Sequence, residues 1–197
     1  MNIAVIYIHG KGGNAKEAEH YKKIFPECEV IGLDYVSETP WEAADEFKMF
    51  FNEIIKKFSS VILIANSIGA FFAMNALNYT QIERAFFISP IVNMEKLICD
   101  MMQWSNVTEE DLIEKGTIET NFGETLSWEY LSWIRNHPIS WNIPTSILYG
   151  SADNLQSIDT IKVFAEGIDA DLTVMENGEH WFHTEEQMAF LDQWMRK

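Results

Sequence analysis

The sequence predicts an α/β protein with a mostly parallel six-stranded sheet and helices on both faces. Six short runs rich in Val, Ile, Leu and Phe are nearly continuous in apolar residues, as expected of strands buried on both faces of a parallel sheet. Stretches with helical periodicity separate these runs, so strand and helix alternate along the chain. The expected strands are residues 3–8, 29–33, 61–65, 85–89, 146–149 and 172–175.

The composition fits one domain of ordinary size. The chain has 197 residues, enough for one sizeable core, and a formal net charge of −16. This charge argues against nucleic acid or an anionic membrane as the main partner, although a local cluster of N–H groups can still bind a small anion. Cys28 and Cys99 are too few for a disulfide scaffold. No signal peptide or membrane span is recognisable, so we expect a cytoplasmic protein.

Helical patterns are clearest at residues 41–58, 67–78 and 184–195. Residues 91–144 interrupt the alternation between the fourth and fifth strands, and they contain no clear strand. We interpret this segment as a helical lid or cap inserted into a single domain that spans residues 1–197.

Two helices are expected inside the insertion. Thr108 has the features of an N-cap, with Gly116 as the end of the helix, and "SWEYLSWIRNHP" forms a second helical stretch. Trp104, Trp128 and Trp133 are either the core of these helices or contacts for a substrate.

The most informative stretch is "VILIANSIGAFFA", in which a strand runs into a tight turn and then a helix. Small residues at Ala65 and Gly69 let strand and helix approach each other closely, and the turn lifts the Ser67 hydroxyl clear of the sheet. The N–H of Ile68 then lies at the helix N-terminus. These features suit a nucleophilic serine. The alternative is that Ser67 only caps an ordinary helix, since serine is a preferred N-cap.

An acid candidate follows the fifth predicted strand. Asp153 lies three residues after Gly150, where that strand ends. A turn rich in Gly, Ser, Asp and Asn also explains these residues without any chemistry. Asp159 is a weaker candidate, because it falls inside the helix expected next.

A base candidate follows the last predicted strand. His180 lies between that strand and the final helix, and His183 competes with it three residues later. Thr184 has the features of the N-cap of the final helix, with Gln187 completing a capping box, so His183 would only flank that helix. A metal site at "HWFH" would need a third ligand, and no HExxH, paired-Cys or similar pattern supplies one. We therefore expect no metal.

The glycine-rich stretch "YIHGKGGNA" allows two interpretations. Gly10, Gly12 and Ala15, with Asp34 at the end of the second strand, fit a dinucleotide-binding fingerprint. The same backbone N–H groups are suited to stabilising an oxyanion formed during catalysis. The histidine at position 9 favours the second interpretation, because a dinucleotide-binding loop has no use for it.

Together these motifs resemble the α/β-hydrolase superfamily. Ser67, Asp153 and His180 occur in that family's triad order, each just after the C-terminal end of a predicted parallel strand, and His9 and Gly10 resemble its HG motif. The resemblance covers essentially the whole chain. The family's two N-terminal antiparallel strands are missing, and alanine replaces the first glycine of the nucleophile turn.

The resemblance implies a serine hydrolase of carboxylesterase type that cleaves a small ester or related acyl compound without a cofactor. Ser67 would be the nucleophile, His180 the general base and then acid, and Asp153 the residue that orients the imidazole. Backbone N–H groups of Lys11 and Ile68 would form the oxyanion hole. Candidate substrate contacts are His9, Trp104, Trp128, Trp133 and Trp181. The alternatives are a dinucleotide-binding protein, or a catalytically silent protein that keeps the fold and binds a ligand.

Overall fold

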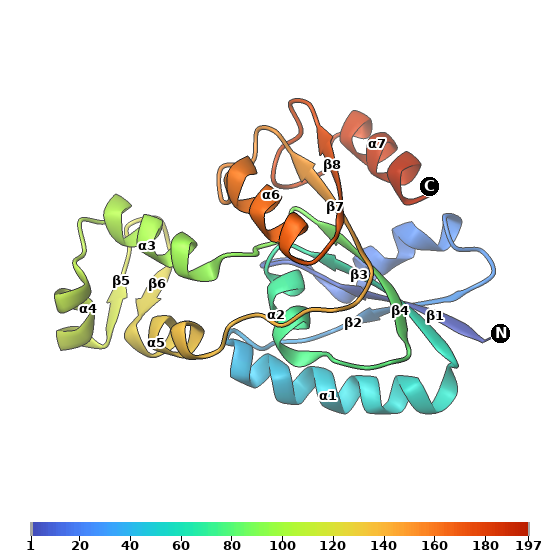
Figure 1. The fold of residues 1–197 in the computed structure, drawn as a ribbon, viewed down its shortest axis with the longest axis horizontal. Helices are drawn as coiled ribbons and strands as arrows, with labels where there is room; N and C mark the ends of the chain where they lie inside the picture. Colours follow the sequence, from blue (N-terminus) through green and yellow to red (C-terminus); the bar gives the residue numbers. More distant parts are fainter. Residues whose placement is uncertain (1, 197) are drawn as a thin grey trace. The chain divides into compact units, whose positions relative to one another are not determined.

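The computed structural model describes residues 2–196 and divides into two compact units (Figure 1). We call residues up to 92 together with those from 140 onward the sheet unit, and Asn93–Ile139 the inserted unit. The inserted unit begins two residues later and ends five residues earlier than the insertion proposed from the sequence, residues 91–144.

The sheet unit contains the expected parallel sheet. Its strand order is β2-β1-β3-β4-β7-β8, and every neighbouring pair is parallel. The predicted fold class is therefore confirmed. The strands are β1 (Ile3–Ile8), β2 (Glu29–Leu33), β3 (Ser60–Asn66), β4 (Ile82–Ile88), β7 (Thr145–Gly150) and β8 (Asp171–Met175).

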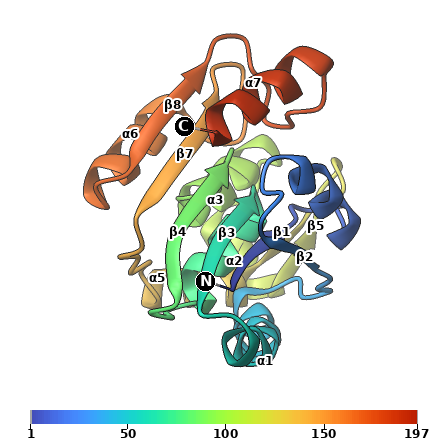
Figure 2. The same ribbon diagram turned by 90° about the vertical axis from the view of Figure 1, so that its right-hand side faces the viewer.

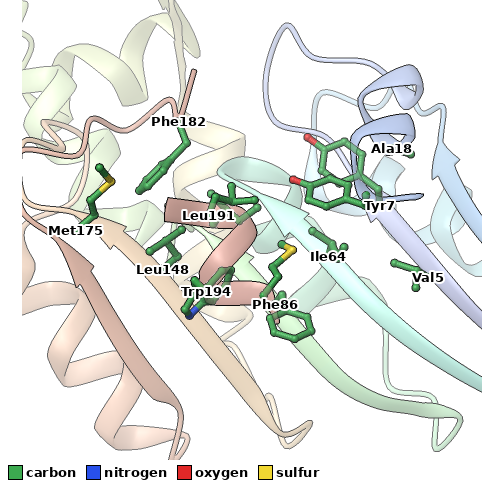
Figure 3. Close-up of a cluster of buried hydrophobic side chains, with 13 residues drawn as sticks. Val5, Tyr7, Ala18, Ile64, Phe86, Leu148, Met175, Phe182, Leu191 and Trp194 are labelled. Carbon is green, nitrogen blue, oxygen red and sulfur yellow. The ribbon is translucent and has the colours of Figure 1, made fainter. Parts of the chain in front are cut away.

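Helices cover both faces of this sheet. A 3₁₀ helix, η1 (Ala15–Lys23), and α7 (Glu185–Met195) contribute to one hydrophobic cluster, in which Figure 3 shows Tyr7 and Ile64 of the strands with Leu191 and Trp194 of α7. The remaining helices of this unit are α1 (Pro40–Lys57), α2 (Ile68–Ala76) and α6 (Ile158–Gly167). Figure 2 shows α6 and α7 on opposite sides of β7 and β8.

Hydrogen-bonded caps explain where the helices begin. Thr39 caps α1 in a capping box with Glu42, and a proline follows it at the first helical position. Thr184 caps α7 as predicted, accepting a bond from the Gln187 N–H. The predicted capping box is wrong, because the Gln187 side chain accepts a hydrogen bond from the N–H of His183, one residue further back (3.1 Å).

The inserted unit has its own small fold. It consists of α3 (Met94–Trp104), α4 (Glu109–Lys115), β5 (Thr117–Glu119), β6 (Thr125–Ser127) and α5 (Trp128–Asn136). Thr108 caps α4 and Gly116 ends it at a φ of 73°, as the sequence predicts. The antiparallel β5–β6 pair corrects the expectation that this segment contains no strand. Three-residue strands are too short to leave a periodic pattern.

Arg135 joins three helices within the inserted unit. From α5 its guanidinium binds Glu95 of α3 at 2.7 Å and both carboxylate oxygens of Glu109 of α4 at 2.8 Å. These bonds lower the pKa of the Glu109 carboxyl. The unit thus carries its own stabilising contacts.

Candidate active site

Ser67 occupies a sharp turn between β3 and α2. Its backbone has a φ of 51° and a ψ of −121°, a region that residues with a side chain rarely adopt. The last residue of β4 and the segment after it hold the turn on both sides. The Ser67 N–H donates to the Ile88 carbonyl (3.0 Å), and the Ser67 carbonyl accepts from the Ile91 N–H (3.2 Å).

The Ser67 hydroxyl bonds a histidine rather than the helix that follows it. The side chain makes no capping hydrogen bond to α2, so the interpretation of Ser67 as an ordinary N-cap does not fit. Instead, its Oγ lies 2.8 Å from Nε2 of His180. The structure thus brings together the candidate nucleophile and the candidate base.

Asp153 completes the hydrogen-bonded chain. Its Oδ2 lies 2.6 Å from Nδ1 of His180, and its side chain is 1% exposed. Its other oxygen accepts hydrogen bonds from the N–H groups of Leu155 (2.8 Å) and Gln156 (3.3 Å). A carboxylate only accepts, so the proton of the neutral imidazole lies on Nδ1, leaving Nε2 to accept from the Ser67 hydroxyl.

The loops carrying Asp153 and His180 are bonded directly to each other. The Ala152 N–H donates to the Gly178 carbonyl (2.8 Å), and the Asn177 N–H donates to the Ser151 hydroxyl (2.7 Å). A Cβ added at Gly150 would lie 2.2 Å from the Gly178 carbonyl oxygen, so only glycine permits this approach. The contact brings the ends of β7 and β8 together, so that Asp153 and His180 lie next to each other.

A second close approach joins the serine turn to the end of β1. A Cβ at Gly69 would lie 2.3 Å from the His9 carbonyl oxygen, and one at Gly10 would lie 3.1 Å from Cβ of Ser67. Ala65, the other small residue of the turn, is fully buried within β3. The closest approach in this turn is therefore at Gly69, the second of its two small residues.

The loop after β1 holds one peptide group in a fixed orientation. The Gly10 carbonyl accepts from the Gly13 N–H (3.1 Å) and bonds Nδ1 of His9 (2.8 Å), which must therefore carry a proton. A trans peptide directs its C=O and N–H in opposite directions, so the Lys11 N–H points away from these two partners. Ile68 opens α2, and the first N–H groups of a helix have no acceptor within it.

His9 lies inside the protein rather than on an open surface. It is 7% exposed, and its ring stacks on Tyr35 with centroids 4.2 Å apart. The Tyr35 hydroxyl donates to the His9 carbonyl (2.8 Å). Burial, aided by the negative charge of Glu46, raises the pKa of Tyr35, so this hydroxyl stays a donor. Sequence reasoning missed Tyr35, because a tyrosine after an apolar strand looks like ordinary core.

The competing acid and base candidates lie outside the hydrogen-bonded chain. Asp159 is exposed in the first turn of α6. His183 stacks on Trp181 (4.7 Å), and its Nδ1 bonds the Trp181 carbonyl. Trp181 itself is 69% exposed, beside His180 in the chain.

The remaining tryptophan candidates belong to the inserted unit. Trp104 is 54% exposed and packs edge-to-face on Phe122, Trp133 stacks on His137 (4.1 Å), and Trp128 is the first residue of α5.

The sheet order bears on the dinucleotide alternative. The common dinucleotide-binding sheet has the order 3-2-1-4-5-6, with the first strand at its centre. Here the order is β2-β1-β3-β4-β7-β8, which differs from it, although β1 and β2, the strands before the glycine-rich loop and Asp34, are parallel neighbours in both orders. Within residues 2–196, no three His, Cys, Asp or Glu side chains are grouped so as to hold a metal ion, and no helix is long and apolar enough to cross a membrane.

Comparison with known proteins places this geometry in a known fold. No family model and no curated protein matches the chain. Est1E from Butyrivibrio proteoclasticus is similar with a TM-score of 0.74 and 14% identity, over 99% of this chain and 85% of that one. Mouse alpha/beta hydrolase domain-containing protein 10 has a TM-score of 0.73 and 15% identity, over 98% and 87%.

A lipase-esterase related protein from Clostridium acetobutylicum ATCC 824 has a TM-score of 0.66 and 16% identity, over 98% of this chain and 93% of that one. These similarities in fold span nearly the whole chain. The chain therefore has the α/β-hydrolase fold.

Proposed function

We propose that this protein is a serine hydrolase that cleaves a small ester or related acyl compound through an acyl-enzyme intermediate. The observation that carries the proposal is the continuous chain Ser67 Oγ–His180 Nε2 (2.8 Å) and His180 Nδ1–Asp153 Oδ2 (2.6 Å). A hydroxyl, an imidazole and a carboxylate in this order are the groups that activate a serine for acyl transfer.

The first half of the reaction forms the acyl-enzyme. His180 Nε2 removes the proton of the Ser67 hydroxyl as Oγ attacks the acyl carbonyl carbon, and the carbonyl oxygen becomes an oxyanion. The N–H groups of Ile68 and Lys11 donate to that oxyanion. His180 then gives its proton to the leaving alcohol, and Asp153 stabilises the imidazolium in between.

The second half releases the acid. Water loses a proton to His180 Nε2 and attacks the acyl carbonyl, and the collapsing intermediate expels Ser67 Oγ, which takes the proton back from His180. Every step is a proton transfer or an acyl transfer between these residues, the substrate and water, so the reaction as proposed needs no cofactor.

Structural neighbours support an ester as the substrate class. Proteins of similar fold include Est1E, which has been solved with ferulic acid bound, and a lipase-esterase related protein.

The net charge of −16 disfavours nucleic acid and anionic membranes as partners. Cys28 and Cys99 are free, which is compatible with the reducing cytoplasm that we propose as its location.

A fluorophosphonate probe and a panel of p-nitrophenyl esters of increasing chain length test the proposal. We expect labelling at Ser67, and we expect Ser67→Ala to abolish labelling and to lower ester turnover by at least about 10⁴-fold. Folded wild-type protein that is not labelled, or a Ser67→Ala variant that is equally active, would contradict it. Thermal stabilisation by NAD(P) or FAD without labelling would favour the dinucleotide alternative instead.

A further inference from the structure

Gln156 is a buried polar residue whose groups hold the loop that carries Asp153. It is 2% exposed, and its N–H donates to Asp153 Oδ1 (3.3 Å). Its carbonyl accepts from the Tyr149 hydroxyl (2.8 Å), and its Nε2 donates to the Leu155 carbonyl (3.1 Å). Residues 151–157 contain no helix or strand, so hydrogen bonds of this kind define the conformation of the loop.

The side-chain oxygen of Gln156 reaches a second part of the site. It accepts the N–H of Val92 at 3.2 Å. The preceding residue, Ile91, donates its own N–H to the Ser67 carbonyl, also at 3.2 Å. Two adjacent residues after β4 therefore hold the serine turn and the acid loop, and Gln156 is the link between them.

Packing alone does not account for a glutamine at this position. A buried amide that lacks hydrogen bonds costs about 1–3 kcal/mol, whereas a leucine or methionine fills similar space without that cost. The Val92 N–H lies beyond Ile88, where the strand pairing of β4 ends, and it takes its acceptor from Gln156. Catalytic groups need to be held within about 0.5 Å of their working geometry, which such a link can supply.

We propose that Gln156 is a positioning residue of the triad. Its amide fixes the Asp153 loop relative to the Ser67 turn, so that the Asp153 carboxylate is aligned with His180 while Ser67 stays in reach of Nε2. Gln156 does not touch the reacting atoms and acts through Asp153. The proposal rests on the serine hydrolase function proposed above.

Replacing Gln156 by methionine tests the link, because Gln156→Met keeps the length of the side chain and removes the acceptor. We expect kcat for a p-nitrophenyl ester to fall about 10- to 100-fold with KM changed less than about twofold. The matched control is Thr145→Val at the opposite end of β7, which removes another buried hydrogen bond, from Trp141 Nε1 to Thr145 Oγ1 (2.8 Å). It should lower the melting temperature and leave kcat at the wild-type value.

A double-mutant cycle with Asp153→Asn separates positioning from general destabilisation. Because Gln156 acts through Asp153, we expect Gln156→Met to add less than about twofold to the loss that Asp153→Asn causes alone. An unchanged kcat in the single variant, or the same 10- to 100-fold loss in both backgrounds, would overturn the proposal. If Gln156→Met does not fold, Gln156→Asn replaces it in the cycle, since its amide is one methylene too short to reach Val92.

Labelling of wild-type protein and turnover by Ser67→Ala distinguish failure of this inference from failure of the proposed function. The inference fails when wild-type protein is labelled at Ser67 and the Gln156 effect is absent or independent of Asp153. The proposed function fails when wild-type protein is not labelled and Ser67→Ala retains turnover, whatever the Gln156 variants do.

Discussion

Ser67 combines an unfavourable backbone conformation with a hydroxyl aimed at His180. A positive φ with a strongly negative ψ costs a residue with a Cβ about 1–3 kcal/mol, whereas glycine adopts it readily. The turn persists because the Ser67 N–H donates to the Ile88 carbonyl and the Ser67 carbonyl accepts from the Ile91 N–H, which holds both sides of the serine backbone. Glycine at this position would therefore favour stability, whereas the proposed catalytic role requires the serine hydroxyl.

Two inactive variants should measure this conflict. We expect Ser67→Gly to unfold at a higher temperature than Ser67→Ala, because both lack the hydroxyl and only alanine keeps the strained Cβ. The difference in free energy of unfolding should be about 1 kcal/mol, after the greater entropy of unfolded glycine is subtracted. Thermal and urea unfolding of the two variants provide the measurement. Equal stabilities would mean that the turn carries no such strain.

His9 was identified from a sequence motif, and the structure adds the contacts that its side chain makes. The sequence suggested a substrate contact, and the structure places its ring against Tyr35 with Nδ1 bonded to the Gly10 carbonyl. In this position the imidazole orients the peptide whose N–H belongs to Lys11. Its contribution to an oxyanion hole would be indirect.

At the scale of elements, the loops after β7 and β8 form one bonded assembly. The closest approach is between Gly150 and the Gly178 carbonyl, where any side chain at position 150 would collide with backbone atoms that cannot rotate away. The spacing of Asp153 and His180 follows from this contact, since each lies within three residues of one of these glycines.

Gly150→Ala should accordingly damage both stability and activity. We expect a lower melting temperature and a loss in kcat of at least about 10-fold, because β7 and β8 must separate near the triad to admit a methyl group. Gly167→Ala is the matched control, since a Cβ at the end of α6 meets nothing within 4 Å. That variant should keep wild-type kcat and gain up to about 1 kcal/mol in stability. Equal behaviour of the two variants would contradict this account of the contact.

The sequence predicted the strands of the main sheet well. Nearly continuous apolar runs marked all six, including the edge strands β2 and β8, which are only partly buried. The start of β4 was placed three residues late, because Glu83 and Arg84 are exposed within the strand and break the apolar run. The β5–β6 hairpin was missed because its strands are three residues long.

At the scale of the molecule, one face of the sheet encloses tyrosines that resist ionisation. Burial, with neighbouring tyrosine and carboxylate groups, raises the pKa of Tyr7, and burial with the charges of Glu17 and Asp192 raises the pKa of Tyr21. The pKa of Tyr35, on the loop after β2, is also raised, mainly by burial. Folding therefore keeps protons on these groups that the unfolded chain loses above about pH 10.

This difference predicts weakening in alkali. Below pH 10 both states hold the protons and stability is unaffected. As the pH rises further, the unfolded chain binds fewer protons, so the free energy of unfolding falls by about 1.4 kcal/mol per pH unit for each such tyrosine. Urea unfolding at pH 9, 10 and 11 should show that the free energy of unfolding declines less steeply for Tyr21→Phe than for wild-type protein. The two slopes should differ by about 1.4 kcal/mol per pH unit, the contribution of one proton. Parallel curves for the two proteins would refute the assignment to Tyr21.

The triad candidates were predictable because their order and their places after parallel strands could be inferred from sequence. The residues that hold them were not. Gln156 and Tyr35 act through contacts between segments far apart in the chain, from Gln156 to Val92 and from Tyr35 to His9. A buried glutamine or tyrosine leaves no periodic pattern, and its partner is decided only when the loops pack.

The inserted unit has an implication for how this protein can diverge. Its chain leaves the sheet unit after β4 and returns before β7, and these two strands are parallel neighbours. Such neighbours require a crossover of a dozen or more residues, but the sheet places no demand on what the crossover contains. Residues 93–139 can therefore change in length and sequence without altering the register of the six strands.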